Sequence, residues 1–195
     1  MKLFVIALTA LLPCLAASSD ADSGKSLGTP NAPIRIEVFS DFECPACKGL
    51  HEQVLPLVMR DYVIPGKVYL VSREFPLPGH PYSREAANYA TAAARIGKYE
   101  QVANALFLNQ AAWEVSGKVW DTVANVLTPA EAKKVQSLAK DASVLSAVER
   151  DVDAGKAAAI NQTPTMIVTR DTRRFPVAGA VNYNLLRSLL DGLLK

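Results

Sequence analysis

Residues 34–47 have the sequence IRIEVFSDFECPAC, in which a β-branched and aromatic run leads directly to two cysteines three positions apart. The run from Ile34 to Phe39 predicts a strand, and the residues from Ser40 to Glu43 predict a short turn. We expect a helix to begin at about Cys44 with Pro45 at its first position, where proline is tolerated because that N–H has no helical partner. The stretch therefore predicts a strand, a turn and a helix that starts at a cysteine pair.

The segment after the cysteine pair completes a strand–helix–strand unit. The helical pattern runs to about Arg60 with a kink expected at Pro56, and Pro65-Gly66 predicts a turn. The alternation from Lys67 to Phe75 predicts a second strand. A strand, a helix and a strand in this order indicate a parallel pair joined by a helical crossover.

A helical block separates this unit from a second pair of strands. Residues 82–160 are Ala-rich with helical periodicity, and we expect four or five helices there, separated near Gly97, Ser116-Gly117, Thr128-Pro129 and Asp141. The strands expected next are Thr165 to Thr169 and Phe175 to Ala178. An amphipathic helix from Asn182 to Leu194 follows them.

Length and composition favour one α/β domain with an inserted all-helical domain. The 195 residues are 50% hydrophobic, which is enough to bury one sizeable core. We assign residues 33–81 and 161–195 to the α/β part and residues 82–160 to the insertion. The formal net charge is only +2 and the basic residues are scattered, so nothing indicates binding to nucleic acid or to a membrane surface.

The N-terminus has the organisation of a secretory signal peptide, which we assign to residues 1–19. Met1-Lys2 is a short basic start, and Leu3 to Ala17 is almost wholly apolar. Cleavage is expected between Ala17 and Ala21, which leaves residues 20–32 as a flexible N-terminus. The mature protein is therefore expected in the periplasm or another extracytoplasmic compartment.

Two alternatives to a cleaved signal peptide remain open. The apolar run could be kept as an N-terminal anchor, although it is short for a membrane-spanning helix. Cys14 raises the question of lipid modification, and Pro13 argues against it because lipidation signals usually have a small residue there. In the exported form, Cys44 and Cys47 are the two cysteines that remain.

The position of Cys44 and Cys47 at the start of a helix predicts redox chemistry. A thiolate there meets free N–H donors and the positive end of the helix dipole, and both lower its pKa. We expect Cys44 to be the more exposed cysteine and the nucleophile, and Cys47, one turn later on the same face, to be the more buried, resolving cysteine. A purely structural disulfide is disfavoured because a bond over so short a loop adds little stability. A zinc site with His51 or His80 is the other alternative, and it is disfavoured because no second cysteine pair exists.

Residues 37–47 (EVFSDFECPAC) resemble the active-site stretch of DsbA-like thiol oxidoreductases of the thioredoxin superfamily. Residues 163–166 (TPTM) resemble the cis-proline loop of that family, and residues 73–77 (REFPL) with the helices after them resemble its second strand and helical domain. The resemblance extends from about Thr29 to the C-terminus. It implies a thioredoxin-like fold and a cis bond before Pro164, which would let an extended substrate segment pair with the backbone of Thr163.

The resemblance also implies supporting roles for residues around the motif. Pro45 and Ala46 lie between the cysteines, and Ala46 occupies the place where the strongest oxidants of the family have a histidine. Because Ala46 cannot donate a hydrogen bond to a thiolate, we expect a less oxidising pair. Thr163 could donate to a cysteine sulfur or serve only the turn. Glu37 resembles a buried acid that accepts a proton from the second cysteine, and a solvent-facing strand residue is the alternative.

Four charged or titratable residues near the motif are expected to have minor roles. Asp41 and Glu43 are interpreted as solvated loop acids rather than as groups that tune Cys44. His51 is interpreted as an exposed or capping helix residue rather than a catalytic one. His80 lies in a proline-rich turn with no evident partner in the sequence.

Together these features predict an exported enzyme that introduces disulfides into reduced secreted proteins, without a metal or organic cofactor. The resemblance implies reoxidation by a membrane partner of the quinone-linked type, and we expect a monomer. A reductase or isomerase of the same compartment is one alternative, because the motif does not set the direction of exchange. A thioredoxin-like chaperone, binding module or metal carrier is the other.

Overall fold

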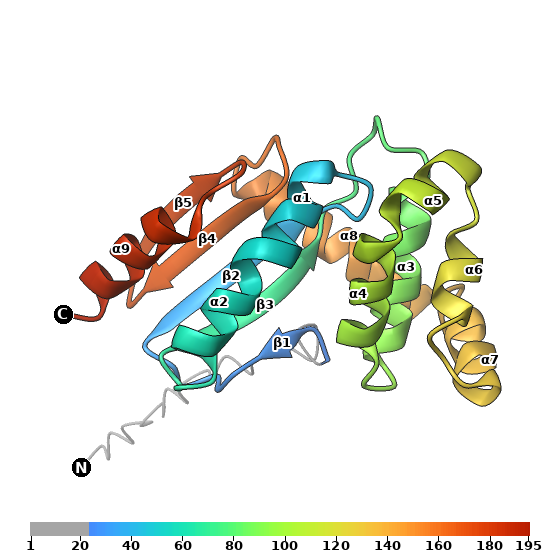
Figure 1. Cartoon of the computed structure of the whole chain (residues 1–195), viewed down its shortest axis with the longest axis horizontal. Coiled ribbons are helices and arrows are strands. Elements are labelled where there is room, and N and C mark those ends of the chain that lie inside the picture. Colours follow the sequence, from blue (N-terminus) through green and yellow to red (C-terminus); the bar gives the residue numbers. More distant parts are fainter. Residues whose placement is uncertain (1–23) are drawn as a thin grey trace, which may run out of the picture.

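The computed structural model describes residues 24–195, which form a mixed sheet with helices on both faces and a group of helices beyond one edge (Figure 1). The predicted signal peptide, its cleavage site and Cys14 lie outside the described residues. Within residues 24–195, no helix has both the length and the apolar character needed to cross a membrane.

The sheet has five strands in the order β1-β3-β2-β4-β5. Their bounds are Ser26–Leu27, Ile34–Ser40, Val68–Glu74, Thr165–Arg170 and Arg173–Ala178 for β1 to β5. Strands β2 and β3 are parallel, as the strand–helix–strand order predicted, whereas the other neighbouring pairs are antiparallel. Strands on either side of the helical insertion, β3 and β4, therefore flank β2, which leads to the cysteine pair.

The N-terminal segment that we expected to be flexible is partly built into the fold. Strand β1 pairs with β3, and the side chain of Lys25 is buried against Asp151 of helix α8 (Ala142–Ala157) with an ion pair between them. A buried ammonium group needs such a partner to offset its loss of water. This partner lies 126 positions away, so the local sequence gave no sign of it.

Between β2 and β3 the chain forms one continuous helical run with alternating geometry. Its parts are α1 (Pro45–Gly49), η2 (Leu50–Val54), α2 (Leu55–Val58) and η3 (Met59–Val63). A kink was expected at Pro56, which lies in α2; instead the run widens into the π-type turn η2 just before α2, and the Leu55 N–H donates to the Leu50 carbonyl. A π turn next to proline accommodates the missing donor of the ring nitrogen.

Six helices follow β3, more than the four or five expected, and no strand lies among them. They are α3 (Ser83–Ala94), α4 (Tyr99–Leu108), α5 (Gln110–Ser116), α6 (Val119–Ala124), α7 (Pro129–Leu138) and α8. The additional break lies at Asn109, whose side chain donates to the Ala105 carbonyl at 2.8 Å, and neither Gly nor Pro marks it. The expected N-cap at Thr128 is present as a capping box with Glu131.

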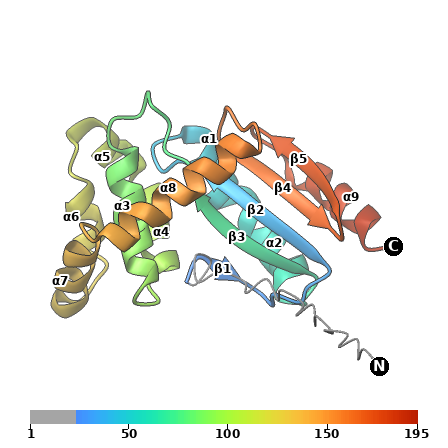
Figure 2. The same cartoon turned by 180° about the vertical axis from the view of Figure 1, so that it is seen from behind.

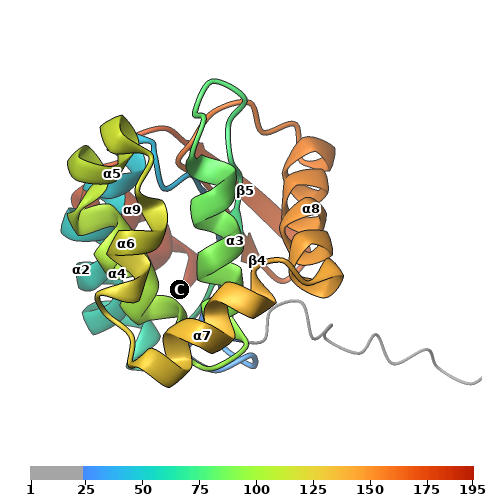
Figure 3. The same ribbon diagram turned by 90° about the vertical axis from the view of Figure 1, so that its right-hand side faces the viewer.

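The hydrophobic residues form three clusters that follow this layering. On one sheet face, Ile34, Ile36 and Val38 pack against the helical run and against α9 (Tyr183–Leu193). On the other face, Phe39 and Phe75 pack against α8, which crosses the back of the sheet (Figure 2). The helices α3 to α7 share a third cluster, and Figure 3 shows them from their own side.

The cysteine pair lies where the helical group meets the sheet. Phe42, Cys44 and Cys47 belong to the same hydrophobic cluster as α3 to α7. Gly155 of α8 lets this helix approach the sheet closely, because a Cβ there would lie 2.4 Å from the Phe75 ring. The inserted helices thus enclose one side of the cysteine pair.

Candidate active site

Cys44 is the N-cap residue of α1, and Pro45 is the first helical residue, as the sequence predicted. The Cys44 carbonyl accepts the first helical hydrogen bonds from the N–H groups of Cys47 and Lys48, both at 3.1 Å. Both cysteines are free thiols in this structure, 7% and 1% exposed for Cys44 and Cys47. The thiol of Cys44 therefore lies at the helix start, where unpaired N–H donors are concentrated.

The pKa of Cys44 is lowered to about 5. The largest cause is a hydrogen bond from the Cys47 thiol, which outweighs the opposing effect of burial. Thr163 and the backbone N–H groups of Cys47 and Ala46 lower the pKa further. Cys44 is therefore a thiolate at neutral pH, which is the nucleophilic form of cysteine.

Burial raises the pKa of Cys47, and the neighbouring Cys44 thiolate raises it further. The Asp41 N–H donates to Sγ of Cys47 at 3.4 Å, and a contact with Ser40 also favours the thiolate, but burial dominates. Cys47 is therefore a protonated thiol when the pair is reduced. Two cysteines one helical turn apart therefore differ in protonation state: Cys44 is a thiolate and Cys47 a thiol.

The loop before β4 brings Thr163 and Pro164 to the cysteine pair. The Thr163–Pro164 bond is cis, as the resemblance implied, and Sγ of Cys44 lies 3.5 Å from the Thr163 carbonyl oxygen, to which it donates only as a protonated thiol. The Thr163 hydroxyl is buried and makes no hydrogen bond of ordinary geometry, although its proximity favours the Cys44 thiolate. The two segments lie 119 positions apart in the sequence.

Glu37 does not lie where a proton acceptor for Cys47 would have to be. It accepts from Arg73 at 2.7 Å, and Arg73 also donates to Asp151 of α8, so these charges lie on the α8 face of the sheet. Successive strand residues point to opposite faces, and the neighbour Val38 faces the helical run that carries Cys47. The hypothesis that Glu37 serves Cys47 is therefore wrong by one strand position.

Asp41 and Glu43 are buried rather than solvated, and His80 has a partner. Asp41 is 1% exposed and accepts from the N–H groups of Glu43 and Leu77, at 2.8 and 2.7 Å. His80 Nδ1 lies 2.8 Å from Oδ2 of the same carboxylate. Glu43 accepts from the Tyr82 N–H at 2.8 Å. The expectations that Asp41 and Glu43 are solvated and that His80 has no partner are therefore incorrect, because residues 76–82 fold back over the turn before Cys44.

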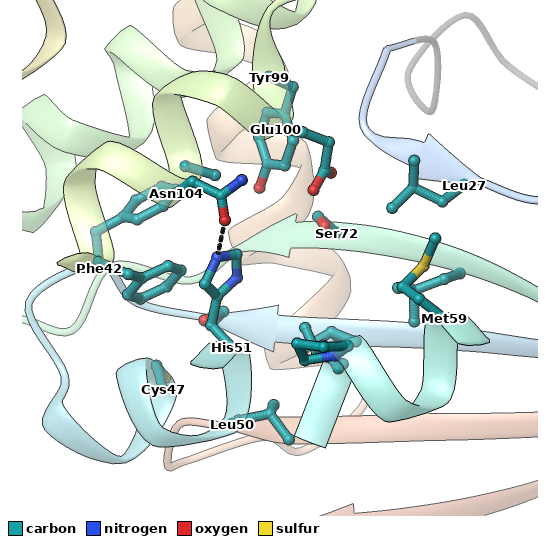
Figure 4. Close-up of a pocket in the computed structure, with 17 residues that line it drawn as sticks. Leu27, Phe42, Cys47, Leu50, His51, Met59, Ser72, Tyr99, Glu100 and Asn104 are labelled. Atoms are coloured by element: carbon teal, nitrogen blue, oxygen red, sulfur yellow. Dashed lines mark hydrogen bonds between the residues drawn. The ribbon is translucent and has the colours of Figure 1, made fainter. Parts of the chain in front are cut away.

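His51 lines a cavity of about 210 Å³ between the helical run and α4. Its Nε2 lies 2.6 Å from Oδ1 of Asn104, and its ring packs against Phe107 with the centroids 4.6 Å apart. Burial lowers the pKa of His51. Figure 4 shows this ring between Cys47 and Asn104, with Glu100 further along the cavity. His51 is thus a packed, hydrogen-bonded residue rather than an exposed one.

No cluster of three or more His, Cys, Asp or Glu side chains suited to a metal ion occurs within residues 24–195. His51 and His80 contact Asn104 and Asp41 respectively, so each histidine has its hydrogen-bond partner elsewhere than on the cysteine sulfurs. The arrangement is suited to thiol chemistry: one thiolate at a helix start, one buried thiol a turn later, and a cis-proline loop beside them.

The fold and this site define a thioredoxin-fold protein with a dithiol centre and inserted helices. A family model described as Thioredoxin matches residues 20–191, and the chain belongs to this family. The chain is also 42% identical over 55 residues to a probable disulfide bond formation protein D of Bacillus cereus. That match covers 28% of this chain and 26% of the relative.

The chain spans about a quarter of the length of the curated relatives it matches, some of which are named Na⁺/H⁺ antiporters. Solved structures match over nearly their full length. BdbD of Bacillus subtilis has a TM-score of 0.75 and 22% identity, with 90% of this chain and 95% of that chain covered. A thioredoxin-like oxidoreductase of Silicibacter pomeroyi has a TM-score of 0.71 and 27% identity, with 90% and 97% covered.

Proposed function

We propose that this chain is an exported thiol:disulfide oxidoreductase that introduces disulfide bonds into folding secreted proteins. The observation that carries the proposal is the pair of opposite pKa shifts at Cys44 and Cys47 beside the cis-proline loop. Thioredoxin family membership and the similarity to a disulfide bond formation protein and to a thioredoxin-like oxidoreductase support it. A low pKa at Cys44 stabilises the reduced pair, and a stable reduced form makes a disulfide oxidising.

The reaction begins with Cys44 and Cys47 joined as a disulfide. A substrate thiolate attacks Sγ of Cys44, the Cys44–Cys47 bond breaks, and Cys47 leaves and takes up a proton. A second substrate thiolate then attacks the substrate sulfur of the mixed disulfide and displaces Cys44 as a thiolate. Two electrons pass from the substrate to the pair, one substrate disulfide forms, and Cys44 is a good leaving group because its pKa is low.

The neighbouring residues have supporting roles in this proposal. Pro45 fixes the start of α1 at the cysteine pair, and the backbone N–H of Ala46 favours the Cys44 thiolate. Thr163 favours the Cys44 thiolate, and the backbone at Thr163 and Pro164 offers an extended substrate segment a strand-like partner. Export by the N-terminal signal sequence, action as a monomer and reoxidation by a quinone-linked membrane partner belong to the same proposal.

Transfer of the disulfide to a reduced protein tests the function. The purified oxidised chain is mixed anaerobically with a reduced, unfolded protein that regains activity only when its disulfides form. We expect about one substrate disulfide per oxidised chain, with loss of the Cys44–Cys47 bond, because dithiol exchange is stoichiometric without a reoxidant. The Cys44→Ala variant is the control and separates an enzyme from a chaperone that acts by binding.

A reductase is the second candidate, and Ala46 is the observation that favours it. No side-chain donor precedes Cys47, so less stabilisation is available to the thiolate than in a motif with histidine at that position. In the same assay, a reductase would leave the substrate reduced and would instead cleave existing substrate disulfides once its own pair is reduced. That outcome would contradict the oxidase proposal.

A further inference from the structure

Residues 76–82, with the sequence PLPGHPY, form a loop between β3 and α3 that is held against the turn before Cys44. Two carboxylates of that turn hold it: Asp41 accepts from the Leu77 N–H and contacts His80, and Glu43 accepts from the Tyr82 N–H. These contacts join residues 36 to 39 positions apart and measure 2.7 to 2.8 Å. The loop places an imidazole next to the redox site.

Asp41 connects this imidazole to the cysteine pair. Its carboxylate is fully enclosed, with 0% of the side chain exposed, whereas the side chain of His80 is 27% exposed. Its backbone carbonyl accepts from the Cys44 N–H at 3.1 Å, and its N–H donates to Sγ of Cys47 at 3.4 Å. One residue therefore contacts His80 through its side chain and both cysteines through its backbone.

The negative charges of Asp41 and Cys44 lie close to His80, so its protonation affects both. An unpaired Asp41 carboxylate in this enclosed place would oppose a second negative charge on Cys44. A protonated His80 offsets the Asp41 charge, so the thiolate can form beside the buried acid. Because Nδ1 contacts the carboxylate, it carries a hydrogen, and Nε2 is the nitrogen that gains or loses the proton.

The groups that act on His80 are Asp41 and Glu43 on the turn and Cys44 at the start of α1. Partial burial lowers the pKa of His80, but the hydrogen bond to Asp41 and the charges of Asp41, Glu43 and Cys44 together raise it above the usual value. The imidazolium is therefore favoured when the Cys44 thiolate is present, and the coupling must act equally in both directions.

We propose that His80, held by Asp41, is a positioning residue that stabilises the Cys44 thiolate and couples the redox state of the cysteine pair to the protonation of the imidazole. It supplies from the β3–α3 loop the positive charge that Ala46 does not supply from within the motif. This inference rests on the proposed function, because it concerns the same dithiol and disulfide states.

The coupling has a definite proton balance. On reduction, two electrons enter the Cys44–Cys47 disulfide, Cys47 takes up one proton, and Cys44 stays a thiolate at any pH above about 5. The new negative charge on Cys44 raises the proton affinity of His80. Between the His80 pKa of the oxidised protein and that of the reduced protein, the imidazole therefore takes up an additional fraction of a proton.

NMR titration of the histidine rings tests the coupling without altering the site. The whole sequence contains two histidines, so two ring signals are followed against pH in the oxidised and the reduced protein, and the His51→Gln variant assigns them. We expect the His80 pKa to be about half a unit higher in the reduced protein, a threefold change in proton affinity. We expect His51, whose ring contacts Asn104 and Phe107, to shift less.

Two variants give the reciprocal measurement at Cys44, followed by thiolate absorbance. His80→Gln removes the charge and should raise the Cys44 pKa by about the same half unit, whereas His80→Lys keeps a positive charge and should restore part of it. A purely structural role for His80 would leave its own pKa independent of redox state.

Failure of the inference can be distinguished from failure of the proposed function. Equal His80 pKa values in the two redox states of a pair that forms and loses its disulfide normally would overturn the role of His80 alone. A Cys44–Cys47 pair that does not form a disulfide would overturn the proposed function, and the coupling with it.

Discussion

Two regions on either side of the short segment Cys44–Cys47 give identical thiols opposite properties. The turn side, made of residues 41–44, the 76–82 loop and the Thr163–Pro164 loop, is rich in N–H donors and charged groups. The helix side, around Cys47, is packed with apolar side chains of the inserted helices. A hydrogen bond from the Cys47 thiol and, on the turn side, Thr163 lower the pKa of Cys44, whereas burial on the helix side raises that of Cys47.

The spacing of two cysteines alone is therefore not sufficient to assign their roles. Cys44 is at the N-cap position, where backbone N–H donors are unpaired. Cys47 is three residues later, in the first hydrogen-bonded turn of the helix. The fold then surrounds each position with different long-range partners. Variants that alter one environment at a time therefore test whether the two surroundings set the two pKa values.

The largest effect is expected from replacing each cysteine with serine. Cys44→Ser should slow substrate oxidation by on the order of 10³-fold or more, because the attacked sulfur is lost. Cys47→Ser should keep a reactive thiolate at Cys44. Mixed with an oxidised substrate, this thiolate attacks the substrate disulfide, displaces one substrate sulfur as a thiolate, and remains trapped as a mixed disulfide because no Cys47 thiol is present to release it. Non-reducing electrophoresis and mass spectrometry detect the trapped species. The reverse pattern, with trapping at Cys47, would show that the two sides have been assigned the wrong way round.

A smaller, graded effect is expected in the pH dependence of alkylation. With a Cys44 pKa of about 5, its thiolate fraction and its rate of reaction with iodoacetamide should rise about tenfold between about pH 4 and pH 6 and then level off. The rate falls as the pH drops through 5 because the thiol becomes protonated. Cys47 should remain unlabelled over this range because its pKa is raised. Peptide mapping of the labelled sites checks both statements, and equal labelling of the two cysteines would contradict them.

The smallest effect is expected from Thr163→Val, which removes one hydroxyl from the turn side. The Cys44 pKa should rise by about half a unit, because one of several groups that favour the thiolate is lost. Thr91→Val is the matched control, since Thr91 is also buried with an unpartnered hydroxyl but lies in α3. Titration of thiolate absorbance gives both values. An unchanged Cys44 pKa in Thr163→Val would show that the Thr163 hydroxyl does not stabilise the Cys44 thiolate.

The sequence was sufficient for the features that depend on local order. The strand, turn and helix around Cys44 and Pro45 follow from residue type and spacing, and the structure places them within one or two residues of the expected bounds. The parallel β2–β3 pair follows from the helical crossover between them. The cis bond before Pro164 followed from the resemblance, since base rates alone favour trans.

The additional helix break at Asn109 is a local failure, whereas the following ones involve partners that are distant in the sequence or a change of strand face. Lys25 is buried because Asp151 receives it, and His80 is held because residues 76–82 fold back onto Asp41. No local pattern contains these pairings. For Glu37 a usable signal was present: Ile34, Ile36 and Val38 alternate as the face that packs against the helical run, so Glu37 belongs to the other face.

The reduction potential of the Cys44–Cys47 pair is the decisive measurement of whether the protein acts as an oxidase. The purified protein is equilibrated with glutathione buffers of known ratio, and the fraction of disulfide is measured after acid quenching. A value more positive than about −200 mV is expected, because the lowered pKa of Cys44 stabilises the reduced pair and so makes the disulfide a donor. A value near or below about −250 mV would contradict the account and would indicate a reductase.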